Sequence, residues 1–276
     1  MLLRPAAVAG RFYPADPVTL AALVDALLGA VRPLGRRPLA LIAPHAGYRF
    51  SGAVAAAAYA QLAGCRDDVA RVVVLGPAHM VPLTGMAVPG MDAFATPLGP
   101  VPVDRDARRA ALDVAGVAVA DRPHADEHAI ETQLPFLLRA IGRPVPVLPV
   151  LVGAASTEAV AGLLSALISG PETVAVVSTD LSHYLDQTEA VHRDRRTAAA
   201  IVARTPEALR PGDACGFRPL CGLLRYAADR DLSVEQLLLA TSMKAGADPT
   251  RVVGYGAFLL TGSDQPYSKR AGSPAP

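Results

Sequence analysis

The chain has 276 residues, of which 51% are hydrophobic, and a formal net charge of +1 at neutral pH. This length and composition suit one large α/β domain with a sizeable core. The near-zero charge gives no reason to expect a nucleic acid or an anionic membrane as a partner.

The cysteine content bears on the cellular compartment. Cys65, Cys215 and Cys221 are few, odd in number and irregularly spaced, which argues against a disulfide framework and favours a reducing compartment. Residues 1–14 lack a sustained apolar run and form a poor signal peptide. No run approaches the roughly 20 apolar residues of a membrane-spanning helix. We therefore expect a cytoplasmic protein.

Helical and strand-like patterns alternate along the chain. The expected helices cover residues 16–29, 51–62, 104–114, 126–141, 156–168, 188–204 and 219–228, and the expected strands cover residues 39–43, 71–76, 86–88, 145–152, 174–178, 234–241 and 251–260. Pro135 interrupts the fourth helix, and Pro146 and Pro149 suggest that their strand lies at a sheet edge. The alternation predicts a single α/β domain over residues 1–262, with a largely parallel, mixed sheet covered by helices on both faces. Residues 263–276 are expected to form a disordered tail.

Three of the strand-like runs end in a short loop that carries a histidine. These histidines are His45, His79 and His183, and Asp180 lies in the third loop. Buried strands of an α/β sheet present functional side chains just past their carboxyl ends. If the three strands are neighbours, the four side chains converge on one pocket. Histidines from different strand ends commonly hold first-row metals, so a metal or acid–base site is expected there.

Two loops each allow a functional and a structural interpretation. Asp180 lies three residues before His183 and can orient its ring for acid–base work, although Asp180 or Ser182 is also a normal helix N-cap. Cys215 lies in a small-residue loop before a helix, where the helix N-terminus lowers a thiol pKa and favours a metal-binding thiolate. The alternative is a small buried hydrophobic residue, a role that suits Cys221 better.

The segment from His124 to His128 matches the inverted zinc-protease pattern H-x-x-E-H, with Glu127 as the base. Two observations speak against a metal helix here. Asp126 is suited to be an N-cap, which would put His124 outside the helix, and a proline interrupts the helix further on. The other interpretation is that Glu127, His128 and Glu131 line the pocket or hold its loops.

Seven motifs, in this order, resemble the Memo family, whose prokaryotic members are often labelled AmmeMemoRadiSam system protein B. They are AVAGRFYP (7–14), PHAGY with FSG (44–52), LGPAH (75–79), TPLG (96–99), DEHAIETQLPF (126–136), STDLSHY (178–184) and ACGFRP (214–219). The family is similar in fold to the class III extradiol dioxygenases, which are non-haem iron enzymes. The resemblance therefore implies an α/β sandwich around a central sheet.

The resemblance also implies roles for individual residues. His45 and His79 match the two histidine ligands of the dioxygenase iron, and His183, with Asp180 beside it, takes the place of the acid–base residue. Cys215 matches the cysteine that Memo proteins have where the dioxygenases have a glutamate. A thiolate suits copper or zinc as well as iron. The resemblance therefore implies that the protein binds one transition metal, Fe(II) or Cu in preference to Zn, and is a candidate oxidoreductase.

The implied partners are a small molecule or peptide in the metal pocket and, through a shared pathway, a radical-SAM protein. Two other functions stay open at this point. One is a binding module without catalysis, in which the histidines hydrogen-bond a peptide or small ligand. The other is a zinc hydrolase built on His124, Glu127 and His128.

Overall fold

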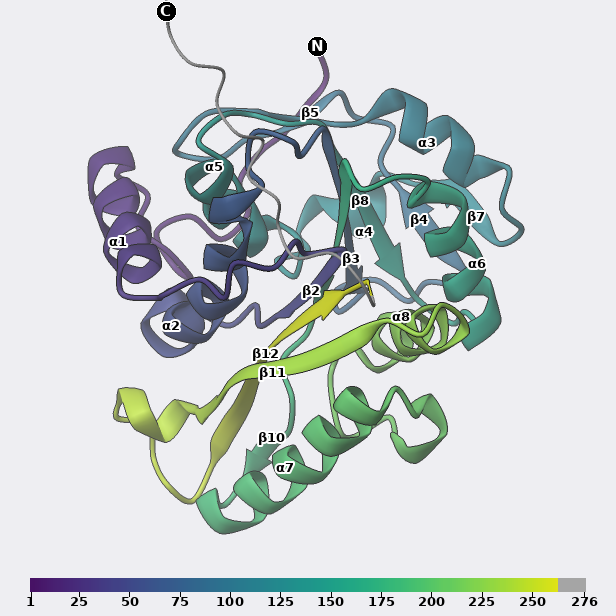
Figure 1. Cartoon of the computed structure of the whole chain (residues 1–276). Helices are drawn as coiled ribbons and strands as arrows, with labels where there is room; N and C mark the ends of the chain where they lie inside the picture. The colour runs from purple at the N-terminus through teal and green to yellow at the C-terminus, as the bar shows by residue number, and fades with distance from the viewer. Residues whose placement is uncertain (263–276) are drawn as a thin grey trace, which may run out of the picture.

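The computed structural model describes residues 1–262, and the C-terminal tail expected at residues 263–276 lies outside them. Within the described chain, a nine-stranded sheet runs in the order β10-β12-β2-β9-β3-β8-β4-β7, and β11 pairs with β12 (Figure 1). The strands are β2 (Ala40–Ala43), β3 (Arg71–Pro77), β4 (Met86–Val88), β7 (Val117–Val119), β8 (Val147–Val152), β9 (Thr173–Ser178), β10 (His183–Leu185), β11 (Ser233–Thr241) and β12 (Val252–Thr261).

The centre of the sheet is parallel. One row of aligned residues crosses it, with Ile42 opposite Val177, Val177 opposite Leu75, and Leu75 opposite Val150. On either side the pairing becomes antiparallel, because β12 runs against β2 and β4 runs against β8. The predicted sheet, largely parallel but mixed, is therefore confirmed.

Helices cover both faces of the sheet, as the alternation of elements predicts. One layer contains α1 (Pro17–Gly29), α2 (Tyr48–Tyr59) and α5 (Leu134–Ile141), and the other contains α3 (Arg105–Leu112), α6 (Thr157–Leu167), α7 (Gln187–Ala203) and α8 (Phe217–Asp229). Successive side chains of a strand point to opposite faces of the sheet. Val72 and Val74 pack against the first helix layer, and Val73 and Leu75 pack against the second. The result is an α/β sandwich.

The first two helices show how local sequence produces this packing. Asp16 caps α1 by accepting the backbone N–H of Thr19 at 2.8 Å, and Leu20 and Val24 on the inner stripe are fully buried. Helix α2 begins at Tyr48, three residues before the predicted start. Its buried alanines allow the helix to lie close to the sheet directly after the loop that carries His45.

The prediction that the strand with Pro146 and Pro149 lies at an edge was wrong. β8 lies between β3 and β4. Its pairing with β4 involves only Leu151 and Val152, so Pro149 lies outside that ladder and its missing N–H removes no bond there. An interior strand can therefore carry this proline.

The helix predicted at residues 126–141 is broken into separate parts. Residues Arg122–Ala125 form the short helix α4, Glu131–Gln133 form a 3-10 turn, and α5 follows. Asp126 is the C-cap of α4 and not the predicted N-cap. Pro135 sits in the first turn of α5, where a proline costs no hydrogen bond. The break leaves residues 126–130 free to form a loop over the sheet edge.

The stretch at residues 82–103 is rich in proline and contains only short strands. It supplies β4 and then β5 (Ala93–Phe94) and β6 (Val101–Pro102), which form a small separate sheet with β1 (Leu3–Arg4). This sheet holds the N-terminal segment beside the main domain. No helix in residues 1–262 is both long enough and apolar enough to cross a membrane.

Candidate metal centre

The three strands whose ends were expected to converge are neighbours. β9 lies between β2 and β3 and is parallel to both, so their carboxyl ends meet at one edge. His45, His79 and Asp180 each lie two residues beyond the end of their strand. Three separate loops therefore bring polar side chains to the same place.

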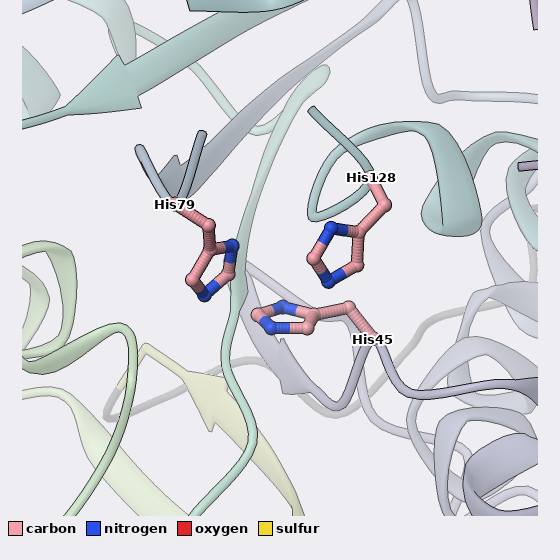
Figure 2. A group of neighbouring side chains, drawn as sticks. All are labelled: His45, His79 and His128. Atoms are coloured by element: carbon pink, nitrogen blue, oxygen red, sulfur yellow. The ribbon is translucent and has the colours of Figure 1, made fainter. Parts of the chain in front are cut away.

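His128 completes a cluster with His45 and His79 (Figure 2). One ring nitrogen from each residue lies within 4.8 Å of the others, and the ring centroids are 4.9 to 5.3 Å apart. His45 is buried, His128 is half-buried and His79 is exposed, so the cluster reaches solvent on the side of His79. The sequence pattern placed His128 among supporting residues, whereas the structure puts its ring directly against the other two.

Hydrogen bonds fix the tautomer of His45. Its Nδ1 lies 2.9 Å from Oγ of Ser178, which donates its own proton to the carbonyl of Ala129 and accepts a bond from Gln133. The hydroxyl has one proton, so Nδ1 of His45 must be the donor to Ser178. The lone pair of the neutral ring then lies on Nε2, the nitrogen a metal would use.

Glu127 orients the other two histidines. Its Oε1 lies 2.9 Å from Nδ1 of His79 and 3.3 Å from Nδ1 of His128. The same carboxylate accepts the backbone N–H groups of His79, His128 and Ala129. All three rings thus have Nδ1 directed to a protein group, which leaves each Nε2 for the shared space between them (Figure 2).

The environment keeps Glu127 ionised although it is buried. Burial alone would raise the pKa of this carboxyl group. The hydrogen bond and charge of His79 and the backbone N–H groups of Ala129 and His79 outweigh burial and lower the pKa to about 2. For His45, burial lowers the pKa well below its usual value, and the neighbouring His79 and His128 lower it further. A carboxylate and a neutral imidazole are the forms suited to a metal site.

Asp180 and Cys215 also contact His45. Oδ1 of Asp180 accepts the backbone N–H of His45 at 2.8 Å, and its Oδ2 lies 3.9 Å from Nε2 of the same residue. Sγ of Cys215 lies 3.2 Å from Nε2 of His45 and accepts the backbone N–H of Asp180. The late loop that carries Cys215 therefore reaches the histidine cluster, although the group of mutually close donors consists of the three histidines.

The expected low pKa of Cys215 was wrong. Burial raises the pKa of this thiol to about 12, and the negative charge of Asp180 adds to the effect. These outweigh the hydrogen bonds from Asp180 and Gly216 that favour the thiolate. Cys221 is buried within α8, as expected of a small hydrophobic residue.

His183 lies close to this group without joining the cluster. Its Nδ1 bonds to the carbonyl of Leu181 at 2.8 Å, so Asp180 does not orient the ring by a hydrogen bond. The N-cap alternative for Asp180 and Ser182 was also wrong. Residues His183–Leu185 form strand β10, and α7 is capped by Asp186.

Glu131 binds the N-terminal segment and not the cluster. Its fully buried carboxylate pairs with the equally buried Arg4 and accepts the hydroxyl of Tyr13 at 2.5 Å. It also accepts the backbone N–H groups of Ala7 and Val8. The segment so fixed carries Phe12, whose ring centroid lies 4.9 Å from that of His128. Glu131 therefore holds the chain that covers one side of His128.

The zinc-protease pattern does not assemble in the fold. Nε2 of His124 bonds to the carbonyl of Ala87 at 3.1 Å, and its ring meets Phe94 edge-on. His124 is buried in α4, away from the group formed by His45, His79 and His128. Because the helix ends at Ala125, no continuous helix presents His124 and His128 on one face. Glu127 binds two other histidines instead.

The fold and the cluster define a class, an α/β sandwich with a histidine group able to hold a metal ion at the carboxyl edge of its parallel strands. A family model described as Memo-like protein matches residues 4–259. The chain belongs to the Memo family.

Curated relatives cover almost all of the chain. A MEMO1 family protein of Ignicoccus hospitalis is 34% identical over 93% of this chain and 98% of its own length. A second, from Methanopyrus kandleri, is 33% identical with the same coverage. A third, from Methanococcoides burtonii, is 32% identical over 94% of this chain and its own full length. The resemblance seen in the sequence motifs is therefore confirmed.

Proposed function

We propose that this protein binds one transition-metal ion, Fe(II) or Cu in preference to Zn, and uses it as an oxidoreductase. The observation that carries the proposal is the common orientation of three imidazoles. Ser178 and Glu127 occupy Nδ1 of His45, His79 and His128, which leaves the three Nε2 atoms for an ion. Imidazole nitrogens suit zinc, copper and iron, so donor type alone does not select one metal.

Cys215 is the proposed sulfur ligand. Metal–nitrogen and metal–sulfur bonds of about 2.0 and 2.3 Å place neighbouring ligand atoms of one ion roughly 3.5 Å apart. The 3.2 Å between Sγ of Cys215 and Nε2 of His45 is close to that spacing. We assign His45, His79 and Cys215 as ligands, with His128 as the fourth donor. A bound ion would displace the proton of the Cys215 thiol. The resulting thiolate among imidazoles favours copper or iron redox chemistry.

Two neighbouring residues have proposed roles in positioning and in proton transfer. Asp180 fixes the backbone at His45 through its N–H and is itself buried, a setting that raises its pKa. His183, from strand β10, is the proposed proton donor and acceptor for a bound small molecule or peptide. A bound Fe(II) or copper ion would supply the electron transfer. We place the protein in the cytoplasm, in a pathway shared with a radical-SAM protein.

Metal analysis of untagged protein, purified without oxygen, tests the proposal. The wild type should contain about one ion per chain, and His45→Ala and His79→Ala should each lose it. His192→Ala is the matched control, because His192 is exposed on α7, and it should keep the metal. Equal metal content in all four proteins would refute the metal function. That result would instead support a binding module without catalysis.

A further inference from the structure

A separate cavity of about 280 Å³ adjoins the candidate metal centre. It lies where β3 and β8 end and α8 begins, and Cys215 is one of its lining residues. Ala78, which also lines it, immediately precedes His79. Its size lies just below the ~300–1,000 Å³ range of typical small-molecule pockets, so it fits a small molecule.

The side chains that line the cavity are apolar except at two points. Pro77, Leu83, Val152 and Phe217 contribute apolar walls. The thiol of Cys215 lies at one point and the guanidinium of Arg218 at another, and no carboxylate is among the lining residues. Nη1 of Arg218 donates to the carbonyl of Ala155 at 3.0 Å, which holds the guanidinium at the cavity rim. The single ionic charge offered to an occupant is therefore positive.

The start of α8 adds to this positive potential. Phe217, Arg218 and Pro219 are its first three residues and all line the cavity. Gly216 at the N-cap has no side chain to bond the first turn, so the helix N-terminus is left without a side-chain cap. Helix N-termini and arginines both favour anions, and together they suit one carboxylate-sized charge.

We propose that this cavity binds a small organic anion with an apolar body, held by Arg218 and the start of α8 with its body beside Cys215. That the anion is the substrate of the neighbouring centre rests on the proposed metal function. The binding itself does not require a metal, since Arg218 and the apolar walls are outside the histidine cluster. The two proposals can therefore fail separately.

Benzoate and its neutral analogue benzamide are the probes for a binding titration with metal-free protein. Wild type should bind benzoate about tenfold more tightly than benzamide, the factor expected of a charge-assisted hydrogen bond. Arg218→Gln should remove this preference and Arg218→Lys should retain part of it. Arg225→Gln is the matched control, because Arg225 is on the same helix and pairs with Asp229. Equal binding of the two probes by wild type, or an unchanged preference in Arg218→Gln, would overturn the proposal.

Alkylation of Cys215 gives a second readout. The thiolate of Cys215 attacks either iodoacetate or iodoacetamide, and its sulfur displaces iodide. Both rates depend on the same fraction of thiolate, so the ratio of the two rates does not depend on the pKa of the thiol. Arg218→Gln should lower the iodoacetate-to-iodoacetamide ratio about tenfold relative to Arg225→Gln. Benzoate should protect Cys215 from both reagents in wild type. The metal content of both variants should stay at the wild-type level, because neither arginine is a proposed metal ligand.

Discussion

Oε1 of Glu127 lies 2.9 Å from Nδ1 of His79, and the other oxygen of the same carboxylate accepts the backbone N–H of His79 at 2.6 Å. Glu127 thus fixes both the ring and the main chain of one histidine. Because Oε1 also lies 3.3 Å from Nδ1 of His128, one buried charge sets the orientation of two rings from different loops. Two of the three rings in the cluster therefore depend on this carboxylate for their orientation.

Glu127→Gln should weaken metal binding without unfolding the domain. The amide cannot accept hydrogen bonds with both of its terminal atoms, so at least one ring loses its orientation. Loss of such supporting groups typically lowers metal affinity about 10–100-fold. A competition titration with a chelator measures the change. Glu158→Gln, an exposed change on α6, should leave the affinity at the wild-type value, and an unchanged affinity in Glu127→Gln would contradict the assigned role.

Cys215→Ala and His128→Ala distinguish the third and fourth ligands. Each variant should lower the affinity for the metal about 10-fold or more, less than the loss expected of His45→Ala. Protein loaded with Cu(II) should show a sulfur-to-copper charge-transfer band that disappears in Cys215→Ala and persists in His128→Ala. The same absorption spectrum in wild type and Cys215→Ala would exclude the sulfur as a ligand.

Glu131→Gln should reduce the stability of the fold and leave the metal stoichiometry intact. Arg4 would then remain buried without its partner charge, which typically costs about 3–5 kcal/mol of unfolding free energy. Urea denaturation measures the loss. Asp229→Asn removes the partner of Arg225 in a half-exposed pair and should cost less than about 1 kcal/mol. Equal losses of unfolding free energy in the two variants would show that the buried pair stabilises the fold no more than the half-exposed pair does.

His124 should make the metal-free protein less stable as the pH falls below about 6.5. Burial lowers the pKa of His124 to about 4, whereas the unfolded chain titrates near 6.5. The unfolded state therefore binds the proton first, and stability present above pH 6.5 is lost progressively down to about pH 4. The full effect is about 3 kcal/mol at 1.36 kcal/mol per pKa unit.

His124→Gln isolates this contribution, because glutamine can still donate to the carbonyl of Ala87. Denaturation curves at several pH values should show a shallower decline of the unfolding free energy for this variant than for wild type. His192→Gln changes an exposed histidine and should follow the wild-type curve. A decline of equal steepness in all three proteins would contradict the assignment.

The sequence by itself determined the sheet and most of the residues at its edge. Apolar runs long enough to be buried on both faces predict parallel strands, and His45, His79 and Asp180 follow three of them at the same offset. Periodicity and capping residues also place α1 correctly. These features are local, since each depends on neighbours along the chain.

Tertiary structure decided the rest. His128 follows no strand, and only the break between α4 and α5 brings its ring against His45 and His79. Pairing of β8 with both β3 and β4 makes the proline-bearing strand an interior one. Burial raises the pKa of Cys215 although its position before a helix predicts the opposite. Each outcome depends on contacts between segments far apart in the chain, and local sequence patterns do not predict such contacts.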